Sequence, residues 1–193
     1  MALNYDEYNL EWPCLKITMV GNGAMGKTSM VYRYYRERFP DSYTPPVFDM
    51  DNLKHVSCPL TGQMYNLRIR DTGGGEDYHR IRRLEYPGTN CFLLLNSIDS
   101  PECLELVDSY WWPELKRHCP RTPIILVGSK MDLRDENSVT FEGGCQIADK
   151  IGAKCYMECS ALTDEGVKDV FEKAVELGAA HLTNKNRRKC SIL

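Results

Sequence analysis

Short apolar runs separated by longer amphipathic stretches recur along this chain. Six runs have the length and composition of β-strands, and they lie at Leu15–Val20, Leu53–Leu60, Met64–Arg70, Cys91–Leu95, Ile124–Val127 and Cys155–Cys159. Thr61-Gly62, between the second and third runs, indicates a hairpin, so we expect one antiparallel edge strand. Runs that are apolar throughout, such as Ile124–Val127, are typical of central strands with both faces covered.

Helical patterns lie between these runs. The stretches with the spacing of an amphipathic helix are Met25–Phe39, Glu102–His118, Gly144–Ile151 and Gly166–Leu182. This alternation predicts an α/β fold, in which about five helices surround a mostly parallel six-stranded sheet with one antiparallel edge strand.

The composition refines this picture mainly by exclusion. With 193 residues, 42% of them hydrophobic and 26% charged, the chain has the size of one domain and the make-up of a folded protein. The formal net charge of -3 argues against a nucleic-acid partner. We divide the chain into an N-terminal extension (1–13), one domain (14–182) and a flexible basic tail (183–193), and we expect a monomer.

The strongest chemical signal is Gly21-Asn22-Gly23-Ala24-Met25-Gly26-Lys27-Thr28, which fits G-x-x-x-x-G-K-[ST] directly after the first strand. Glycines let the backbone curl so that several N–H groups point at one phosphate, and the start of the next helix adds its dipole. Lys27 brings positive charge to the outer phosphates, and Thr28 offers a hydroxyl to Mg²⁺. This segment predicts a phosphate-binding loop, and we include Ser29 in it.

A second motif, Ser129-Lys130-Met131-Asp132, follows the strand Ile124–Val127. The Asp132 carboxylate can accept two hydrogen bonds from guanine, whereas the N1 acceptor of adenine would repel it. Ligands of open parallel sheets bind at the carboxyl ends of strands, which is where this motif lies. After the next strand, backbone N–H groups of Ser160, Ala161 and Leu162 are placed to meet the guanine carbonyl. The two motifs in this order predict a guanine-nucleotide site.

With these motifs, the chain resembles the P-loop NTPases of the Ras superfamily, and within them the Rho/Rac small GTPases. The further motifs that carry the resemblance are Phe39-Pro40-x-x-Tyr43-x-Pro45-x-Val47-Phe48-Asp49, Asp71-Thr72-x-Gly74 with Glu76-Asp77-Tyr78, Tyr86-Pro87, Trp112-Pro113-Glu114, His118-Cys119-Pro120 and Thr122–Gly128. The resemblance implies a small-GTPase domain over residues 14–182, with GTP or GDP and Mg²⁺ as cofactors. It also implies that Phe39 stacks on the guanine edge, that Asp71 holds Mg²⁺ through water, and that the Gly74 N–H senses the γ-phosphate.

The chain departs from this family at two positions with direct chemical duties. Gly75 replaces the glutamine that orients the attacking water, so of the catalytic side chains only Lys27 remains. In the switch segment, represented by Tyr43, Thr44 and Pro46, the proline replaces a threonine that gives its hydroxyl to Mg²⁺ and its N–H to the γ-phosphate. A slide of two residues would bring Thr44 to the metal instead. These departures predict slow or absent hydrolysis of GTP to GDP and phosphate.

Two other segments bear on the comparison. Between Asp135 and Gly144 the chain is too short for the charged helix that Rho proteins usually carry. Arg80, Arg82 and Arg83 follow the glycine run, and we interpret them as a solvated basic face, with a partner contact as the alternative.

The sequence ends in Cys190-Ser191-Ile192-Leu193, a C-a-a-X pattern whose final leucine favours geranylgeranylation of Cys190. Four cations precede it between Lys185 and Lys189. One lipid alone anchors a protein only marginally, and a basic cluster adds attraction to anionic lipid. We therefore expect attachment to the cytoplasmic face of the plasma membrane or of endomembranes, with a cytosolic pool.

These expectations leave two functional hypotheses. The first is a Rho-type, membrane-anchored guanine-nucleotide-binding signalling protein with impaired hydrolysis, which acts on the cytoskeleton or membrane traffic through effectors, exchange factors and a lipid-binding dissociation inhibitor. The second is a nucleotide-insensitive adaptor that holds GTP or GDP as a structural ligand. A P-loop kinase fits less well, because Asp71-x-x-Gly74 and Ser129-Lys130-x-Asp132 have no place in it.

Overall fold

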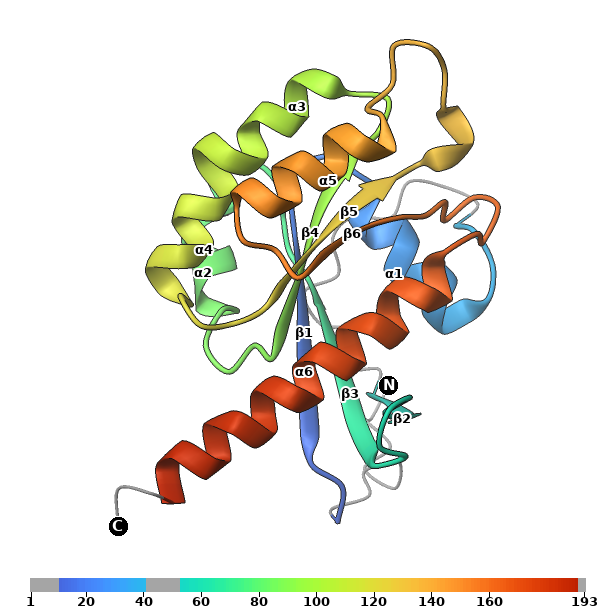
Figure 1. Cartoon of the computed structure of the whole chain (residues 1–193). Helices are drawn as coiled ribbons and strands as arrows, with labels where there is room; N and C mark the ends of the chain where they lie inside the picture. The colour runs from blue at the N-terminus through green and yellow to red at the C-terminus, as the bar shows by residue number, and fades with distance from the viewer. Residues whose placement is uncertain (1–10, 41–52, 191–193) are drawn as a thin grey trace.

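The computed structural model describes residues 11–40 and 53–190, with side chains up to residue 185. It contains a six-stranded sheet in the order β2-β3-β1-β4-β5-β6 (Figure 1). The strands are β1 (Cys14–Val20), β2 (Leu53–Ser57), β3 (Met64–Asp71), β4 (Cys91–Ser97), β5 (Ile124–Ser129) and β6 (Cys155–Glu158). All neighbours pair in parallel except β2 with β3, so the predicted sheet with one antiparallel edge strand is confirmed.

The helices that surround the sheet follow the predicted alternation. They are α1 (Lys27–Arg36), α2 (His79–Leu84), α3 (Pro101–Leu106), α4 (Trp112–His118), α5 (Phe141–Lys150) and α6 (Val167–Cys190). A π-helical turn, η3 (Val107–Trp111), joins α3 to α4, so the single helix predicted over Glu102–His118 is continuous but irregular. Short 3₁₀ turns, η2 (Glu76–Tyr78) and η4 (Met131–Leu133), precede α2 and follow β5. The apolar spacing did not predict α2, which has only six residues.

Two layers of helices bury the two faces of the sheet (Figure 1). In β4, Leu93 and Leu95 face the layer of α1 and α6, whereas Phe92 and Leu94 face the layer of α3, α4 and α5. All four are almost fully buried, which explains why this run is apolar throughout. The expectation of central strands covered on both faces is confirmed.

Helix α6 is longer than the sequence pattern predicted. The apolar spacing placed its end at Leu182, but the helix continues to Cys190. Residues 183–190 contain neither glycine nor proline, and cations near a helix C-terminus interact favourably with its dipole. The hydroxyl of Thr183 donates to the carbonyl oxygen of Ala179 at 3.0 Å, within this extension. None of the helices in the described ranges has both the length and the apolar content that a membrane span requires.

Candidate functional site

The segment between β1 and α1 forms a tight loop at the carboxyl end of β1. Gly21 has a φ of 136°, and a Cβ added there would lie 2.3 Å from the carbonyl oxygen of Leu95. Gly26 precedes the first residue of α1 with a φ of 80°, a conformation that side chains disfavour. At Gly23 an added Cβ would meet no described atom within 4 Å, so packing does not require a glycine there. The loop therefore has the shape expected of a phosphate loop, and α1 starts at Lys27 rather than at Met25 as predicted.

Lys27 lies across this loop. Its ammonium group is buried and donates hydrogen bonds to the carbonyl oxygens of Gly21 at 2.7 Å and Asn22 at 2.5 Å. Burial lowers the pKa of Lys27 to about 8, although the charge of Asp71 opposes this shift. An anionic phosphate oxygen is a stronger acceptor than a carbonyl oxygen, so this buried cation suits a phosphate ligand.

Thr28 and Asp71 form the part of the site expected to hold magnesium. The Thr28 hydroxyl donates to Oδ2 of Asp71 at 2.6 Å. Oδ1 of Asp71 is buried, and within the described residues it has no hydrogen-bond partner. Burial raises the pKa of Asp71, while the Thr28 hydrogen bond and the Lys27 charge act against this rise. Hard oxygen ligands of this kind fit Mg²⁺, which would neutralise phosphate charge beside them when bound.

The three glycines after β3 differ in their surroundings. A Cβ on Gly73 would lie 2.5 Å from the Tyr78 ring, and one on Gly74 would lie 2.3–2.5 Å from the backbone of Asn22 and Gly23. A Cβ on Gly75 would lie 3.5 Å from its nearest neighbour in Tyr78, which is ordinary contact, and its φ of -78° suits any residue. The fold therefore requires the first two glycines and leaves room for a side chain at the third.

Arg82 lies behind this glycine loop, and it is not part of a solvated face. It is 0% exposed, so our interpretation of Arg80, Arg82 and Arg83 is wrong for this residue. Its guanidinium donates to the carbonyl oxygens of Gly73 at 3.2 Å and Gly75 at 3.4 Å. The sequence offered no signal for this role, because the three arginines look alike in it.

A chain of contacts joins Arg82 to the phosphate loop. Arg82 pairs with buried Glu114 at 3.1 Å, and the Tyr86 hydroxyl donates to the same carboxylate at 2.5 Å. The Arg82 guanidinium lies 4.4 Å from the ring centre of Trp111, whose indole N–H donates to Oδ1 of Asn22 at 2.6 Å. Burial works to raise the pKa of Glu114, but the hydrogen bonds from Arg82 and Tyr86 outweigh it and the pKa is lowered. Glu114 is thus a carboxylate held as an anion beside a buried cation.

The second motif lies beside the phosphate loop at the carboxyl end of β5. The Ser129 hydroxyl donates to the carbonyl oxygen of Met25 at 2.7 Å, which ties the two motifs together. Lys130 has a φ of 59° and turns the chain into η4, which carries Asp132. Oδ1 of Asp132 accepts a hydrogen bond from the Ser160 hydroxyl at 2.5 Å.

Arg33 on α1 fixes the segment after β6 on this side of the site. Its side chain donates to the carbonyl oxygens of Ala161 and Leu162, both at 2.8 Å. Both carbonyl oxygens therefore accept hydrogen bonds from a residue of α1. We did not single out Arg33, because its partners lie 128 and 129 positions further along the chain.

These elements enclose one cavity of about 730 Å³. The predicted residues that line it are Gly23, Ala24, Met25, Gly26, Lys27, Thr28, Ser29, Phe39, Gly74, Gly75, Ser129, Lys130, Asp132, Ala161 and Leu162. Gly21, Asp71 and Ser160 are adjacent, through the contacts given above. Gly73, Tyr78 and Leu133 also line the cavity and were not predicted. Tyr43, Thr44, Pro46 and the side chain of Cys190 lie outside the part of the chain that the structure describes.

The Ras family model matches residues 16–179. This match covers most of the chain; it begins within β1 and spans both motifs and the other five strands of the sheet. The chain belongs to the Ras family. It is therefore a GTP-binding small GTPase, and the cavity between the phosphate loop and Asp132 is where the two sequence motifs predict the nucleotide.

Proposed function

We propose that this Ras-family protein is a membrane-anchored signalling GTPase of the Rho type that hydrolyses GTP slowly. The observation that carries the proposal is Gly75 in the position directly after Asp71-x-x-Gly74. Among the described residues that line the cavity, Asp132 alone has a carboxylate or amide side chain. Asp132 lies in the motif expected to bind the base, so none of these lining residues replaces the missing glutamine with a carboxylate or amide at the γ-phosphate. Hydrolysis by GTPases depends on positioning the attacking water, and Gly75 has no side chain to do so.

A substitution at residue 75 tests this proposal directly. The space beside Gly75 admits a side chain, so Gly75→Gln is expected to fold and to speed single-turnover hydrolysis on the order of tenfold to a hundredfold. Gly75→Leu is the matched control, because it adds similar bulk without an amide. Equal acceleration by both variants, or rapid turnover by the unaltered protein, would contradict slow hydrolysis through loss of the glutamine.

The Rho assignment and its signalling role rest on the matched motifs. Tyr86 and Glu114, which belong to two of them, are joined by a hydrogen bond in the structure. Effectors, exchange factors and a lipid-binding dissociation inhibitor are the partners this assignment implies, in cytoskeletal or membrane-traffic signalling. A pull-down from cells with the GTP-loaded and the GDP-loaded protein measures whether partners distinguish the two states.

A second candidate function is that of an adaptor with nucleotide as a structural ligand. Its support is Pro46, which lacks the hydroxyl and the N–H that would tie the switch segment to GTP. A ligand shifts a conformation only through differential contacts, and two of them are missing. Pro46→Thr should then raise the affinity for GTP relative to GDP when Mg²⁺ is present. An unchanged affinity ratio would show that another residue, such as Thr44, completes the metal site.

Membrane attachment is proposed through a geranylgeranyl group on Cys190, aided by the basic residues before it. The test is fractionation of cells that express the full chain. Cys190→Ser should move the protein from the membrane fraction to the soluble fraction, since the remaining cations bind anionic lipid only weakly. Unchanged membrane association would remove the lipid from the proposal.

A further inference from the structure

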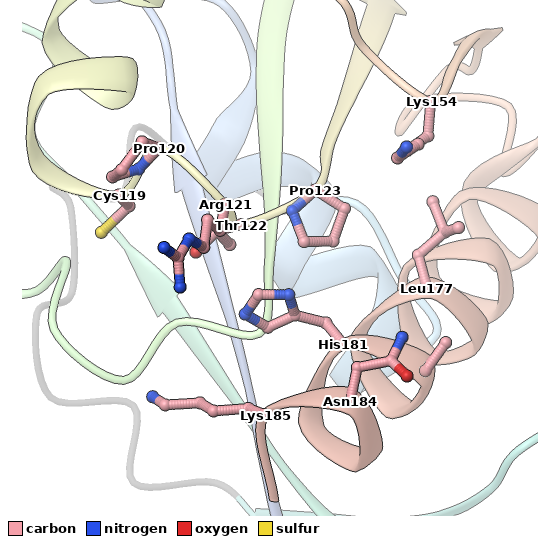
Figure 2. A pocket seen from close by; sticks show the side chains of 11 residues that line it. Cys119, Pro120, Arg121, Thr122, Pro123, Lys154, Leu177, His181, Asn184 and Lys185 are labelled. Atoms are coloured by element: carbon pink, nitrogen blue, oxygen red, sulfur yellow. The ribbon is translucent and has the colours of Figure 1, made fainter. Parts of the chain in front are cut away.

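A second cavity, of about 950 Å³, is lined by residues 119–123, by Lys154 and by residues of α6 (Figure 2). Two of its lining residues, Pro123 and Lys154, directly precede β5 and β6. The cavity is therefore at the amino ends of these parallel strands, whereas the nucleotide motifs lie at carboxyl ends. Two ligands could occupy the two cavities at the same time.

Helix α6 forms one wall of this cavity. The residues it contributes include Leu177, Ala180, His181 and Lys185, whose spacing places them on one face of the helix. Leu177 and Ala180 give this wall an apolar part, and Lys185 puts a cation at its far end. Leu177 at the start of this face is partly buried against the core, whereas Ala180 and Lys185 are exposed.

The charged side chains that line the cavity are all basic. They are Arg121, Lys154 and Lys185, to which His181 adds an imidazole, and none of the cavity's lining residues in the described part of the chain is an aspartate or glutamate. Figure 2 shows the His181 ring in the middle, with Arg121 and Lys185 on one side of it and Lys154 on the other. The chain as a whole carries a net charge of -3, so these cations are concentrated locally against the overall charge.

Backbone hydrogen bonds fix the wall opposite α6. The carbonyl oxygen of Pro123 accepts from the Phe92 N–H at 2.9 Å, and the Lys154 N–H donates to the carbonyl oxygen of Ile124 at 2.8 Å. Lys154 therefore extends from backbone that is attached to the sheet, and Arg121 lies two residues before Pro123, in a turn where the Thr122 N–H donates to the carbonyl oxygen of Cys119 at 3.1 Å. A ligand would not have to order this backbone, which favours binding.

We propose that this cavity binds the phosphate groups of a polyol phosphate, as found in inositol phosphates and inositol lipid headgroups. The three basic side chains of Arg121, Lys154 and Lys185 around one opening match a ligand with two or more phosphates. The apolar wall at Leu177 and Ala180 suits the carbon face of a polyol ring. The volume lies in the range of small-molecule sites. The phosphate loop lies at the carboxyl end of β1, whereas this cavity lies at the amino ends of β5 and β6. The proposed site is therefore separate from the nucleotide site.

A membrane lipid is the source that the structure favours. Lys185 lies five residues before Cys190 on the same helix, a distance of about 7.5 Å along the axis. A lipid on Cys190 would hold this cavity near the headgroups of the bilayer. The choice of a membrane lipid as the ligand depends on the proposed anchoring at Cys190. The proposal that the cavity binds phosphate groups does not depend on it.

The test uses the full, unlipidated chain loaded with GDP and Mg²⁺, so that the phosphate loop is already saturated. One arm titrates inositol trisphosphate by calorimetry and follows the amide signals of Cys119, Arg121, Thr122 and residues 177–185 by NMR. The other arm measures sedimentation with phosphatidylcholine vesicles that contain phosphatidylinositol bisphosphate. GDP binding is measured separately for every variant, so a failed nucleotide assignment is told apart from a failed second site.

Three cavity variants and one control variant locate the ligand. Lys154→Gln and Lys185→Gln should each weaken inositol trisphosphate binding about fivefold. Lys168→Gln is the matched control, because Lys168 is an exposed lysine of α6 outside the cavity and the substitution changes the net charge equally. Ala180→Trp should block the cavity and abolish binding without any change in charge.

Each result decides the proposal. Loss of binding in the cavity variants but not in Lys168→Gln supports the proposal. If binding to the vesicles falls in parallel, the ligand is a membrane lipid. If only the soluble ligand loses affinity, the ligand is a free polyol phosphate. Equal binding by all variants, or no shift of the amide signals, would overturn it. So would failure of both arms to bind.

Discussion

The guanidinium of Arg82 and the carboxylate of Glu114 form a buried ion pair with hydrogen bonds of 3.1 and 3.2 Å. The same guanidinium holds the carbonyl oxygens of Gly73 and Gly75. The loop expected to sense the γ-phosphate is thus supported from behind by a charge pair between α2 and α4. Gly73–Gly75 have no side chains that could hold the loop in place, so residues outside the loop stabilise it.

Removal of one partner of this pair should be costly. Arg82→Met removes the buried cation and leaves Glu114 with only the half-exposed Arg83, at 3.1 Å, so we expect the free energy of unfolding to fall by about 3 kcal/mol in urea titrations at saturating GDP. Arg80→Met is the control, because Arg80 is exposed, and its effect should stay within about 0.5 kcal/mol. The double variant Arg82→Met/Glu114→Leu should recover part of the loss. Equal stability of the Arg82 and Arg80 variants would refute a structural role for the pair.

The same pair predicts a pH dependence. Because the pKa of Glu114 is lower in the folded protein than in the unfolded chain, its contribution is complete above its ordinary value of 4.5. The contribution is lost as the pH falls through the folded-state pKa. The stability difference between the unaltered protein and Glu114→Gln should therefore be constant from neutral pH down to about pH 5 and shrink below it. A difference that does not change in acid would assign the loss to packing alone.

The sheet could be predicted from the sequence because its strands carry a local signal. Buried on both faces, Cys91–Leu95 and Ile124–Val127 are apolar throughout, and the structure places β4 and β5 there. The second predicted strand was too long, because the Gly62 N–H donates to the carbonyl oxygen of Cys58 and closes a turn after Ser57. Local patterns thus identified the strands, and local backbone hydrogen bonds set their ends.

The nucleotide motifs could also be predicted, because their residues are contiguous. The supporting contacts could not, since each joins segments far apart in the sequence. Trp111 is buried, and its hydrogen bond to Asn22 spans 89 positions. Arg82 and Glu114 are 32 positions apart. Charged residues at such separations carry no periodic signal that marks them as buried partners.

The glycines after β3 predict opposite effects of the same substitution. Gly74→Ala would push its Cβ into the backbone of Asn22 and Gly23, so the free energy of unfolding should fall by about 1–3 kcal/mol. Gly75→Ala has room and an ordinary φ, so it should raise this free energy by about 0.4–1 kcal/mol. Urea denaturation at saturating GDP measures both. If Gly74→Ala were as stable as Gly75→Ala, the loop would not lie against the phosphate loop.

The choice of guanine is predicted to depend on Asp132. Asp132→Asn replaces one carboxylate oxygen by an amide donor, which then faces the N1–H or amino donor of guanine. GDP affinity should fall on the order of a hundredfold, as measured by calorimetry with nucleotide-free protein. Asp169→Asn is the control, because this carboxylate is exposed on α6 and does not line the cavity. Unchanged GDP affinity in the Asp132 variant would separate this residue from base recognition.

The contribution of magnesium is predicted to depend on the Thr28 hydroxyl. Thr28→Ala removes the group that donates to Asp71 at 2.6 Å and that we expect to bind the metal. In the unaltered protein, EDTA should speed the release of fluorescent GDP about tenfold or more, because the metal's hold on the phosphates is lost. In Thr28→Ala, release should already be fast with Mg²⁺ present and gain little from EDTA. Thr28→Ser keeps the hydroxyl and should behave like the unaltered protein. Full EDTA sensitivity in Thr28→Ala would show that the metal is held by other residues.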